Sequence, residues 1–136
     1  MKRVLANGCF DPLHYGHVLH LRAARAMGDY LIVALTMDDA VSREKGDGRP
    51  LYTWEQRAGL LSELRCVNAI VGSDNACSII TMLAPDIFVK GIDYTMTGIE
   101  KEVREACELV GAEIRYTDTP KLSASEYIGR MRALAA

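Results

Sequence analysis

The chain has 136 residues, of which 49% are apolar and 25% are charged, and its formal net charge is −2. This length predicts one domain, residues 1–136, that is large enough to bury a core. The near balance of charge gives no support for a nucleic-acid-binding surface, so an anionic ligand must be held by a local cluster of residues. No apolar run approaches the ~20 residues needed to cross a bilayer, so we expect no membrane association.

The cysteine pattern indicates a reducing compartment. The four cysteines are scattered and form no C-x-x-C pair: Cys9, Cys66, Cys77 and Cys107. The N-terminal residues do not have the cationic and apolar pattern of a signal segment. We therefore expect a cytoplasmic protein with free thiols, and not a disulfide or metal framework.

Short apolar runs alternate with segments of helical spacing along the chain. In chain order, we expect a strand at 3–7, a helix at 18–27, a strand at 30–35, a short helix ending at 43, a helix at 53–64, a strand at 69–71, a helix from about 74 to before 85, a strand at 86–89, a helix at 98–110, a strand at 113–116 and a last helix from 123 onward. This alternation predicts an α/β, Rossmann-like fold with a five-stranded parallel sheet and helices on both faces.

Several helix ends carry recognisable capping residues. Gly28 follows the first helix, as a glycine just past the last turn often does. Thr53 with Gln56, and Ser123 with Glu126, have the spacing of a capping box, in which the first side chain bonds the backbone three residues on. These pairs predict where two of the helices begin.

The loops that follow the strands contain most of the residues able to do chemistry. They are residues 7–17, 36–53, 90–98 and 117–123. In open parallel sheets, ligands bind beyond the carboxyl ends of the strands, near the point where the strand order reverses. We therefore expect these four loops to converge on one site.

The first of these loops has the features of a phosphate site. Gly8 lets the backbone approach a phosphate, and the helix start that follows presents free N–H groups to an anion. His14 and His17 are neighbours on one face of the first helical turn, and Gly16 relieves crowding between them. Imidazoles beside backbone N–H groups suit an α-phosphoryl group that gains charge in a transition state.

Two other interpretations of these histidines stay open. They could be ordinary side chains, one of them capping the helix, or half of a zinc site. Zinc would need a third ligand, and no further histidine lies in a separate loop. His20 lies further into the helix, where we expect it to face solvent or a neighbour.

The same stretch resembles the signature of a known family. Gly8-Cys9-Phe10-Asp11, followed by His14-Tyr15-Gly16-His17, is similar to the motifs of the cytidylyltransferase-like nucleotidyltransferases. Members of that family transfer a nucleoside monophosphate from CTP or ATP to a phosphate-bearing substrate and release pyrophosphate. The resemblance extends from residue 3 to about 131.

The resemblance implies roles for these residues. His14 and His17 would contact the nucleotide phosphates and stabilise the pentacoordinate α-phosphorus. Gly8, Gly16 and the backbone at Cys9 and Phe10 would contribute to nucleotide binding. Asp11 would orient either the metal-bound phosphates or the phosphate of the incoming acceptor, unless it is a structural loop acid. The resemblance also implies a homodimer, with Mg²⁺ held mainly by the triphosphate and not by protein ligands.

The segment Lys45–Pro50 resembles the K-G-x-x-R-P of the adenylyltransferases that make ADP-heptose. Lys45 could fold over the triphosphate and place a catalytic positive charge where pyrophosphate leaves. Arg49 could bind the acceptor phosphate with its bidentate fork. Arg57 matches a family arginine that lies near the phosphates or supports the loop. A solvated loop and a helix-surface arginine are the alternatives.

Lys90-Gly91-Ile92-Asp93-Tyr94, after the fourth strand, again resembles the heptose subgroup. There, Gly91 would let a flat base approach the backbone and Asp93 would accept hydrogen bonds from the base or ribose. Lys90 is a further candidate contact to the nucleotide. The alternatives are a simple turn at Gly91 and a helix cap at Asp93.

The stretch Thr119–Ser125 is the last candidate. Ser123 at a helix N-cap offers an anion site through backbone geometry, and Thr119 belongs to the same nucleotide-binding motif. The family carries a serine-threonine-threonine cluster here, whose middle threonine is replaced by Ala124, and Lys121 stands where a glycine is usual. These departures leave the choice between ATP and CTP open.

The leading hypothesis is an enzyme that transfers AMP from ATP to a sugar phosphate such as heptose 1-phosphate. The alternatives are a CTP-dependent enzyme acting on glycerol 3-phosphate or another polyol phosphate, an FAD-forming adenylyltransferase, and a nucleotide-binding sensor without turnover. A nucleic-acid-binding module is disfavoured because the basic residues are dispersed and balanced by acids.

Overall fold

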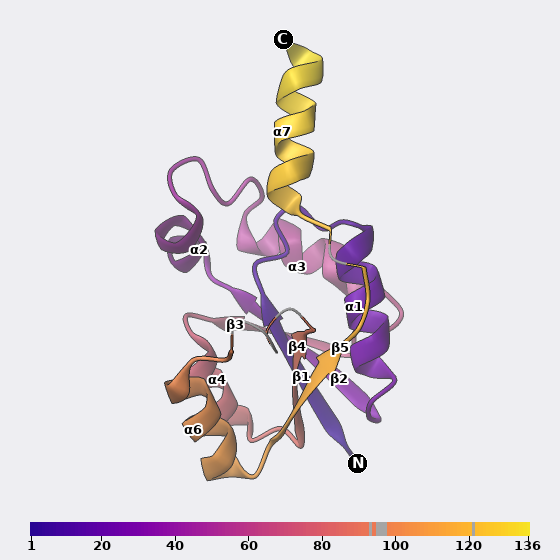
Figure 1. Cartoon of the computed structure of the whole chain (residues 1–136), viewed down its shortest axis with the longest axis vertical. Helices are drawn as coiled ribbons and strands as arrows, with labels where there is room; N and C mark the ends of the chain where they lie inside the picture. The colour runs from indigo at the N-terminus through magenta and orange to yellow at the C-terminus, as the bar shows by residue number, and fades with distance from the viewer. Residues whose placement is uncertain (93, 95–97, 121) are drawn as a thin grey trace.

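The structure is a computed structural model that describes residues 1–92, 94, 98–120 and 122–136. Strands and helices alternate along the chain (Figure 1). In chain order they are β1 (Arg3–Gly8), α1 (Tyr15–Arg25), β2 (Tyr30–Thr36), α2 (Asp38–Lys45), α3 (Trp54–Ser62), β3 (Ala69–Ser73), α4 (Ala76–Leu83), β4 (Ile87–Gly91), α6 (Lys101–Val110), β5 (Glu113–Thr117) and α7 (Ala124–Ala135).

The five strands form one parallel sheet in the order β3-β2-β1-β4-β5. β1 lies at the centre, where Val4 is in register with Leu31 of β2 on one side and with Ile87 of β4 on the other. The chain builds β1 to β3 toward one edge and then returns to add β4 and β5 at the other. The order therefore reverses between β1 and β4, which is where such sheets bind ligands.

Helices cover both faces of the sheet, as the sequence predicts. Successive side chains of a strand point to opposite faces, so Val4 and Ala6 face one core and Leu5 faces the other. The first core is completed by apolar residues of α1 and α3, and the second by residues of α4 and α6 (Figure 1). Burial of β1 and β2 on both faces explains their nearly continuous apolar sequences.

The predicted capping boxes are present at α3 and partly at α7. Thr53 Oγ1 accepts from the Gln56 N–H at 3.2 Å, and Gln56 Oε1 accepts from the Thr53 N–H at 3.1 Å. Ser123 Oγ accepts from the Glu126 N–H at 3.4 Å. These hydrogen bonds satisfy backbone donors that the helix leaves without an intrahelical partner.

Five predicted helix boundaries are wrong by a turn or less, among them the end of α1, at Arg25 and not Met27, and the end of α2, at Lys45 and not Arg43. α1 begins at Tyr15 and not at Val18, because His14 takes the extended N-cap conformation. α3 ends at Ser62, two residues early. α6 begins at Lys101 and not at Gly98, because Gly98 has a φ of +81° that a right-handed helix cannot continue.

The last helix contacts the body of the protein near its start, where the ring centroids of Tyr127 and His14 are 5.4 Å apart. α7 extends away from the sheet and its covering helices (Figure 1), and none of its residues is buried. Within the described part of the chain, no helix combines the length and apolarity required to cross a membrane.

Candidate active site

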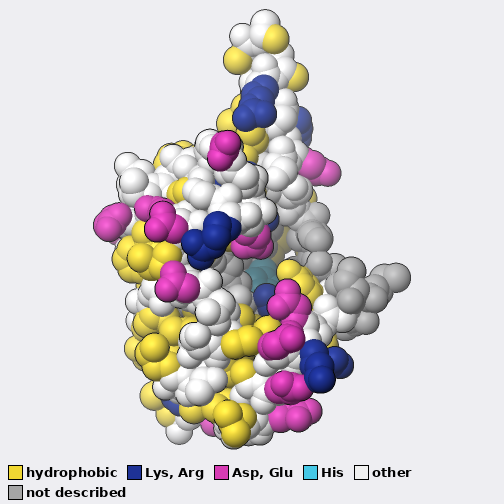
Figure 2. Space-filling view, turned by 90° about the vertical axis from the view of Figure 1, so that its left-hand side faces the viewer, with side chains coloured by type: hydrophobic (Ala, Val, Ile, Leu, Met, Phe, Trp, Pro, Cys, Tyr) yellow, Lys and Arg dark blue, Asp and Glu magenta, His cyan; other side chains and the backbone are white. Residues whose placement is uncertain are grey.

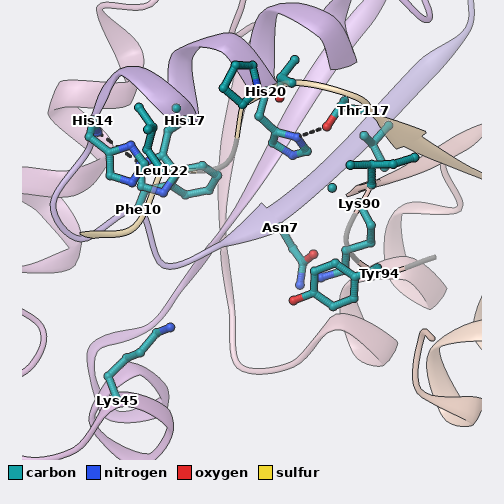
Figure 3. A pocket seen from close by; sticks show the side chains of 16 residues that line it. Asn7, Phe10, His14, His17, His20, Lys45, Lys90, Tyr94, Thr117 and Leu122 are labelled. Atoms are coloured by element: carbon teal, nitrogen blue, oxygen red, sulfur yellow. Dashed lines mark hydrogen bonds between the residues drawn. The ribbon is translucent and has the colours of Figure 1, made fainter. Parts of the chain in front are cut away.

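A cavity of about 350 Å³ opens at the carboxyl ends of β1, β4 and β5, beside the first turn of α1 (Figure 3). A histidine is visible at the bottom of a hollow on the face shown in Figure 2. The residues that line the cavity come from four separate loops and the adjoining elements. They are Asn7, Phe10, His14, Gly16, His17, His20, Lys45, Val89, Lys90, Gly91, Ile92, Tyr94, Thr117, Thr119, Pro120 and Leu122. The convergence expected from the sequence is therefore present.

The fold fixes the protonation of His17. The backbone N–H of His14 donates to His17 Nδ1 at 3.2 Å, so in the neutral ring the proton is on Nε2. Burial, followed by the nearby His14, His20 and Lys45, lowers the pKa of His17 to about 3. At neutral pH His17 is consequently an uncharged hydrogen-bond donor with a defined tautomer.

His14 stacks on His17, with the ring centroids 3.7 Å apart and the planes at 21°. Both of its ring nitrogens are shielded from water and have no hydrogen-bond partner among the described residues. Burial also lowers the pKa of His14. A buried imidazole without a partner is costly in a folded protein, and a ligand in the cavity could supply the missing hydrogen bonds.

Two glycines allow this arrangement. A Cβ on Gly16 would lie 3.0 Å from both His14 Cε1 and Leu122 Cβ, so the close packing of the histidine against the loop before α7 requires glycine there. A Cβ on Gly8 would lie 2.9 Å from the ring of Phe10, whose own φ is +49°. Gly8 thus makes room for the ring that packs edge-on against His17, with 4.9 Å between centroids.

The charges around the cavity favour an anion. Lys45 is the last residue of α2, and Lys90 lies on β4 with its Nζ 4.8 Å from the centre of the Tyr94 ring. The described residues that line the cavity include no aspartate or glutamate. Backbone N–H groups at the start of α1 add to the positive potential.

The contacts of Asp11 favour the alternative of a structural loop acid over the predicted role toward the phosphates. Asp11 is 2% exposed and does not line the cavity. Its Oδ2 accepts from Arg49 Nε at 3.0 Å and from the Leu51 N–H at 2.7 Å, and its Oδ1 accepts from the Tyr52 N–H at 3.0 Å. Arg49 also donates to the Asp11 carbonyl. Asp11 and Arg49, which were each predicted to act on a phosphate, therefore connect loop 49–52 to loop 9–12.

Arg57 is fully buried, with 0% of its surface exposed. Its guanidinium donates to the carbonyls of Tyr52, Cys9 and Thr36 at 2.8–3.0 Å, and to Asp38 Oδ1 at 2.6 Å. Four of its five N–H groups are used in these bonds, and the buried side chain does not line the cavity, so the geometry does not favour the predicted substrate contact. The alternative, that Arg57 supports the loop, agrees with this geometry.

Residues 5–130 match the model of the cytidylyltransferase-like family. The chain belongs to the cytidylyltransferase-like family. Curated relatives include the bifunctional protein HldE of Helicobacter pylori, 47% identical over 104 residues, and that of Citrifermentans bemidjiense, 46% identical over 108 residues. The alignments cover 75% and 77% of this chain but only 22% of each relative, so the chain corresponds to about a fifth of those proteins. The match to the family model assigns the chain to a family of nucleotidyltransferases.

Solved structures share the fold of this cytidylyltransferase-like chain. A lipopolysaccharide core biosynthesis protein from Thermoplasma volcanium superposes with a TM-score of 0.71 and 28% identity, over 90% of this chain and 99% of that one. TmcAL from Thermotoga maritima, bound with α-thio ATP, gives a TM-score of 0.71 at 13% identity, over 99% of this chain and 51% of that one. The second likeness concerns the fold alone.

The cavity of this cytidylyltransferase-like enzyme contains eight of the residues proposed from sequence. They are Phe10, His14, Gly16, His17, Lys45, Lys90, Gly91 and Thr119. Gly8, Cys9 and Ser123 lie outside its lining, where Ser123 caps α7 and the carbonyl of Cys9 binds Arg57. Burial, with Glu44 nearby, raises the pKa of the Cys9 thiol. Asp93 and Lys121 lie outside the described residues.

Sequence reasoning missed other residues of this cavity. His20 contacts a neighbour, as expected, because its Nδ1 lies 2.6 Å from Thr117 Oγ1 at the end of β5. Both His20 and Thr117 line the cavity, which was not expected. Asn7, the residue before Gly8, contributes a buried carbonyl oxygen. Asn7 lies within β1, and neither its lack of a partner among the described residues nor the pairing of α1 with β5 can be seen outside the folded structure.

Proposed function

We propose that the protein transfers AMP from ATP to a sugar 1-phosphate of the heptose type and releases pyrophosphate. The observation that carries the proposal is the histidine pair, in which His17 presents a fixed Nε2–H and His14 has two buried ring nitrogens without partners among the described residues. Such groups are suited to the oxygens of a phosphoryl group that gains charge during transfer.

In the proposed reaction an oxygen of the acceptor phosphate attacks the α-phosphorus of ATP. The bond from the α-phosphorus to the bridging oxygen breaks, and pyrophosphate leaves with that oxygen. His17 donates to a non-bridging α-oxygen, and Lys45 stabilises the negative charge on the leaving group. No protein nucleophile is required. The histidines act by positioning and by stabilising charge.

Mg²⁺ is proposed as the cofactor, bound mainly through the triphosphate, where it would neutralise part of the phosphate charge. No cluster of three histidine, cysteine or acidic side chains occurs in the described ranges. The described cavity lining offers cations and neutral donors, a set that suits phosphates better than a bare divalent ion.

The nature of the acceptor is inferred from sequence. The segments Lys45–Pro50 and Val89–Tyr94 resemble those of ADP-heptose adenylyltransferases. The HldE relatives, and a structural relative described as a lipopolysaccharide core biosynthesis protein, support chemistry on a sugar phosphate.

A pyrophosphate-release assay tests the proposal. ATP and CTP would each be combined with heptose 1-phosphate, other sugar 1-phosphates, glycerol 3-phosphate and FMN. We expect the highest kcat/KM for ATP with heptose 1-phosphate. Higher activity for CTP with glycerol 3-phosphate would replace this substrate pair by the alternative one. Tight ATP binding with no pyrophosphate from any pair would identify a nucleotide sensor.

A further inference from the structure

Asn7 is the last residue but one of β1, the central strand, and it lines the cavity. Its Oδ1 is shielded from water and has no hydrogen-bond partner among the described residues. In the described part of the chain, the other buried side-chain atoms of this kind are the two ring nitrogens of His14. All three atoms belong to residues of one cavity, which is the pattern expected of a binding site that awaits a ligand.

The chemistry of Oδ1 restricts what can satisfy it. A carbonyl oxygen only accepts hydrogen bonds, and so do the ionised oxygens of a triphosphate. The phosphates that suit His17 and Lys45 therefore cannot supply the hydrogen bond that Asn7 Oδ1 lacks among the described residues. Its partner must donate an O–H or N–H group.

The position of Asn7 favours the part of the ligand next to the phosphates. Asn7 lies near the end of β1, before the loop that leads to His14 and the start of α1. Figure 3 shows it on the side of the cavity where Lys90 and Tyr94 lie, away from the histidine pair. In the proposed reaction each reacting phosphate is attached directly to a sugar, and the base lies one ring further away. The donor nearest to Asn7 is then a sugar hydroxyl.

We propose that Asn7 is a specificity-determining residue whose Oδ1 accepts a hydrogen bond from a sugar hydroxyl of the bound ligand. This inference rests on the proposed function. The hydroxyl belongs to the ribose of the nucleotide or to the acceptor sugar, and the two sources share the same chemistry. Replacing that hydroxyl by hydrogen leaves Oδ1 buried without a donor, so the site rejects the deoxy compound.

The test compares hydroxylated and deoxy ligands in wild type, Asn7→Ala and Asn7→Asp. The ribose arm measures the Kd of ATP, 2′-deoxy-ATP and 3′-deoxy-ATP by calorimetry without acceptor. The acceptor arm measures kcat/KM in pyrophosphate release with heptose 1-phosphate and its single-deoxy analogues. In the arm that contains the recognised hydroxyl, we expect wild type to favour the hydroxylated ligand over the deoxy ligand about tenfold in Kd or in kcat/KM, which is the effect of one well-formed hydrogen bond.

Asn7→Ala should bring that ratio close to one, whereas Asn7→Asp, which keeps an acceptor oxygen, should retain a preference even if its overall affinity falls. Asn75→Ala is the matched control, because Asn75 caps α4 and does not line the cavity; its ratio should equal that of wild type. A ratio that Asn7→Ala leaves unchanged in both arms, or no wild-type preference in either arm, overturns the proposal.

Thermal unfolding separates recognition from a structural role. Because Oδ1 has no protein partner among the described residues, Asn7→Ala should unfold at the same temperature as wild type or higher, and a lower temperature would indicate a structural role. If wild type releases no pyrophosphate with any substrate pair, the proposed function fails. The ribose arm still tests the role of Asn7 in that case, because it measures binding without turnover.

Discussion

Two sets of buried or half-buried polar residues differ in how their hydrogen bonds are made. In the loop network, defined as Asp11, Arg49 and Arg57, the carboxylate oxygens of Asp11 and every guanidinium nitrogen of Arg57 have protein partners. In the cavity, His14 and Asn7 have buried atoms with no partner among the described residues.

Whether a buried polar group has a protein partner distinguishes structural residues from ligand-binding residues better than residue type does. Arginine and aspartate near a phosphate motif suggest substrate contacts, yet here they connect loop 9–12 to loop 49–52 and to α3. The atoms left without partners in the described ranges belong to a histidine and an asparagine, and they lie where the strand order reverses. A polar group that the fold has satisfied stabilises the fold, whereas one that it has not satisfied needs a ligand.

The largest effect should come from breaking the loop network. Arg57→Met removes a fully buried cation and leaves the carbonyls of Cys9, Thr36 and Tyr52 without their donor. We expect a loss of about 3–5 kcal/mol in the free energy of unfolding, measured by urea titration. Arg43→Met, at an exposed position of α2, should change it by less than about 0.5 kcal/mol. A similar small change in both variants would show that Arg57 does not hold the loops together.

Substitutions in the cavity should have the opposite effect, lowering activity and leaving the free energy of unfolding nearly unchanged. His17→Ala removes the donor with the fixed tautomer, and we expect kcat to fall about 10²–10³-fold with little change in the urea midpoint. His20→Ala, in which the lost ring is bonded to Thr117, should lower kcat less than tenfold. Near-normal turnover of His17→Ala would remove the proposed mechanism.

A smaller effect is expected at the exposed lysine of the cavity. Lys45→Ala should lower kcat about 10- to 100-fold and change the KM for the acceptor less, because a charged hydrogen bond to the leaving pyrophosphate is lost. Lys101→Ala is the control, since this lysine pairs with Glu105 on α6, and its kcat should equal that of wild type. An unchanged kcat in Lys45→Ala would make Lys45 an ordinary solvated side chain.

The smallest effect is the pH dependence of stability. The pKa of His17 is about 3 in the folded protein, against an ordinary value of 6.5, so between these values the unfolded chain binds a proton that the folded protein does not. Stability should therefore fall as the pH drops through this window, with His17 contributing about 1 kcal/mol per pH unit. Urea titrations at pH 7, 6 and 5 should show a shallower decline for His17→Ala. Equal declines would show that His17 is not held in its neutral form by burial.

Most of the fold could be predicted from the sequence because the local residue patterns indicate the same strands and helices that the parallel sheet requires. β1 and β2 are apolar throughout, since both of their faces are buried, and Thr53 with Gln56 marks the start of α3 through a hydrogen-bonded box. The errors occur at helix ends such as Gly98, where one backbone angle decides the boundary.

The site was predicted less completely, for a physical reason. The histidines and Lys45, which line the cavity, could be singled out because they belong to short motifs with local spacing. The partners of Asp11 lie 38 to 41 residues away and one partner of Arg57 lies 48 residues away, which spacing cannot reveal. Asn7 could not be singled out either, because the lack of a partner is a property of the folded structure alone.

The proposed mechanism requires ring nitrogens of His14 and His17 to bind the nucleotide phosphates. Long-range ¹H–¹⁵N spectra of the three imidazoles, recorded while Mg²⁺ and α,β-methylene-ATP are added, test it directly. We predict that the ring-nitrogen resonances of His14 and His17 shift as the nucleotide binds, with the His17 proton remaining on Nε2. Saturation of the protein, verified by calorimetry, with both sets of resonances unmoved would contradict the proposed mechanism.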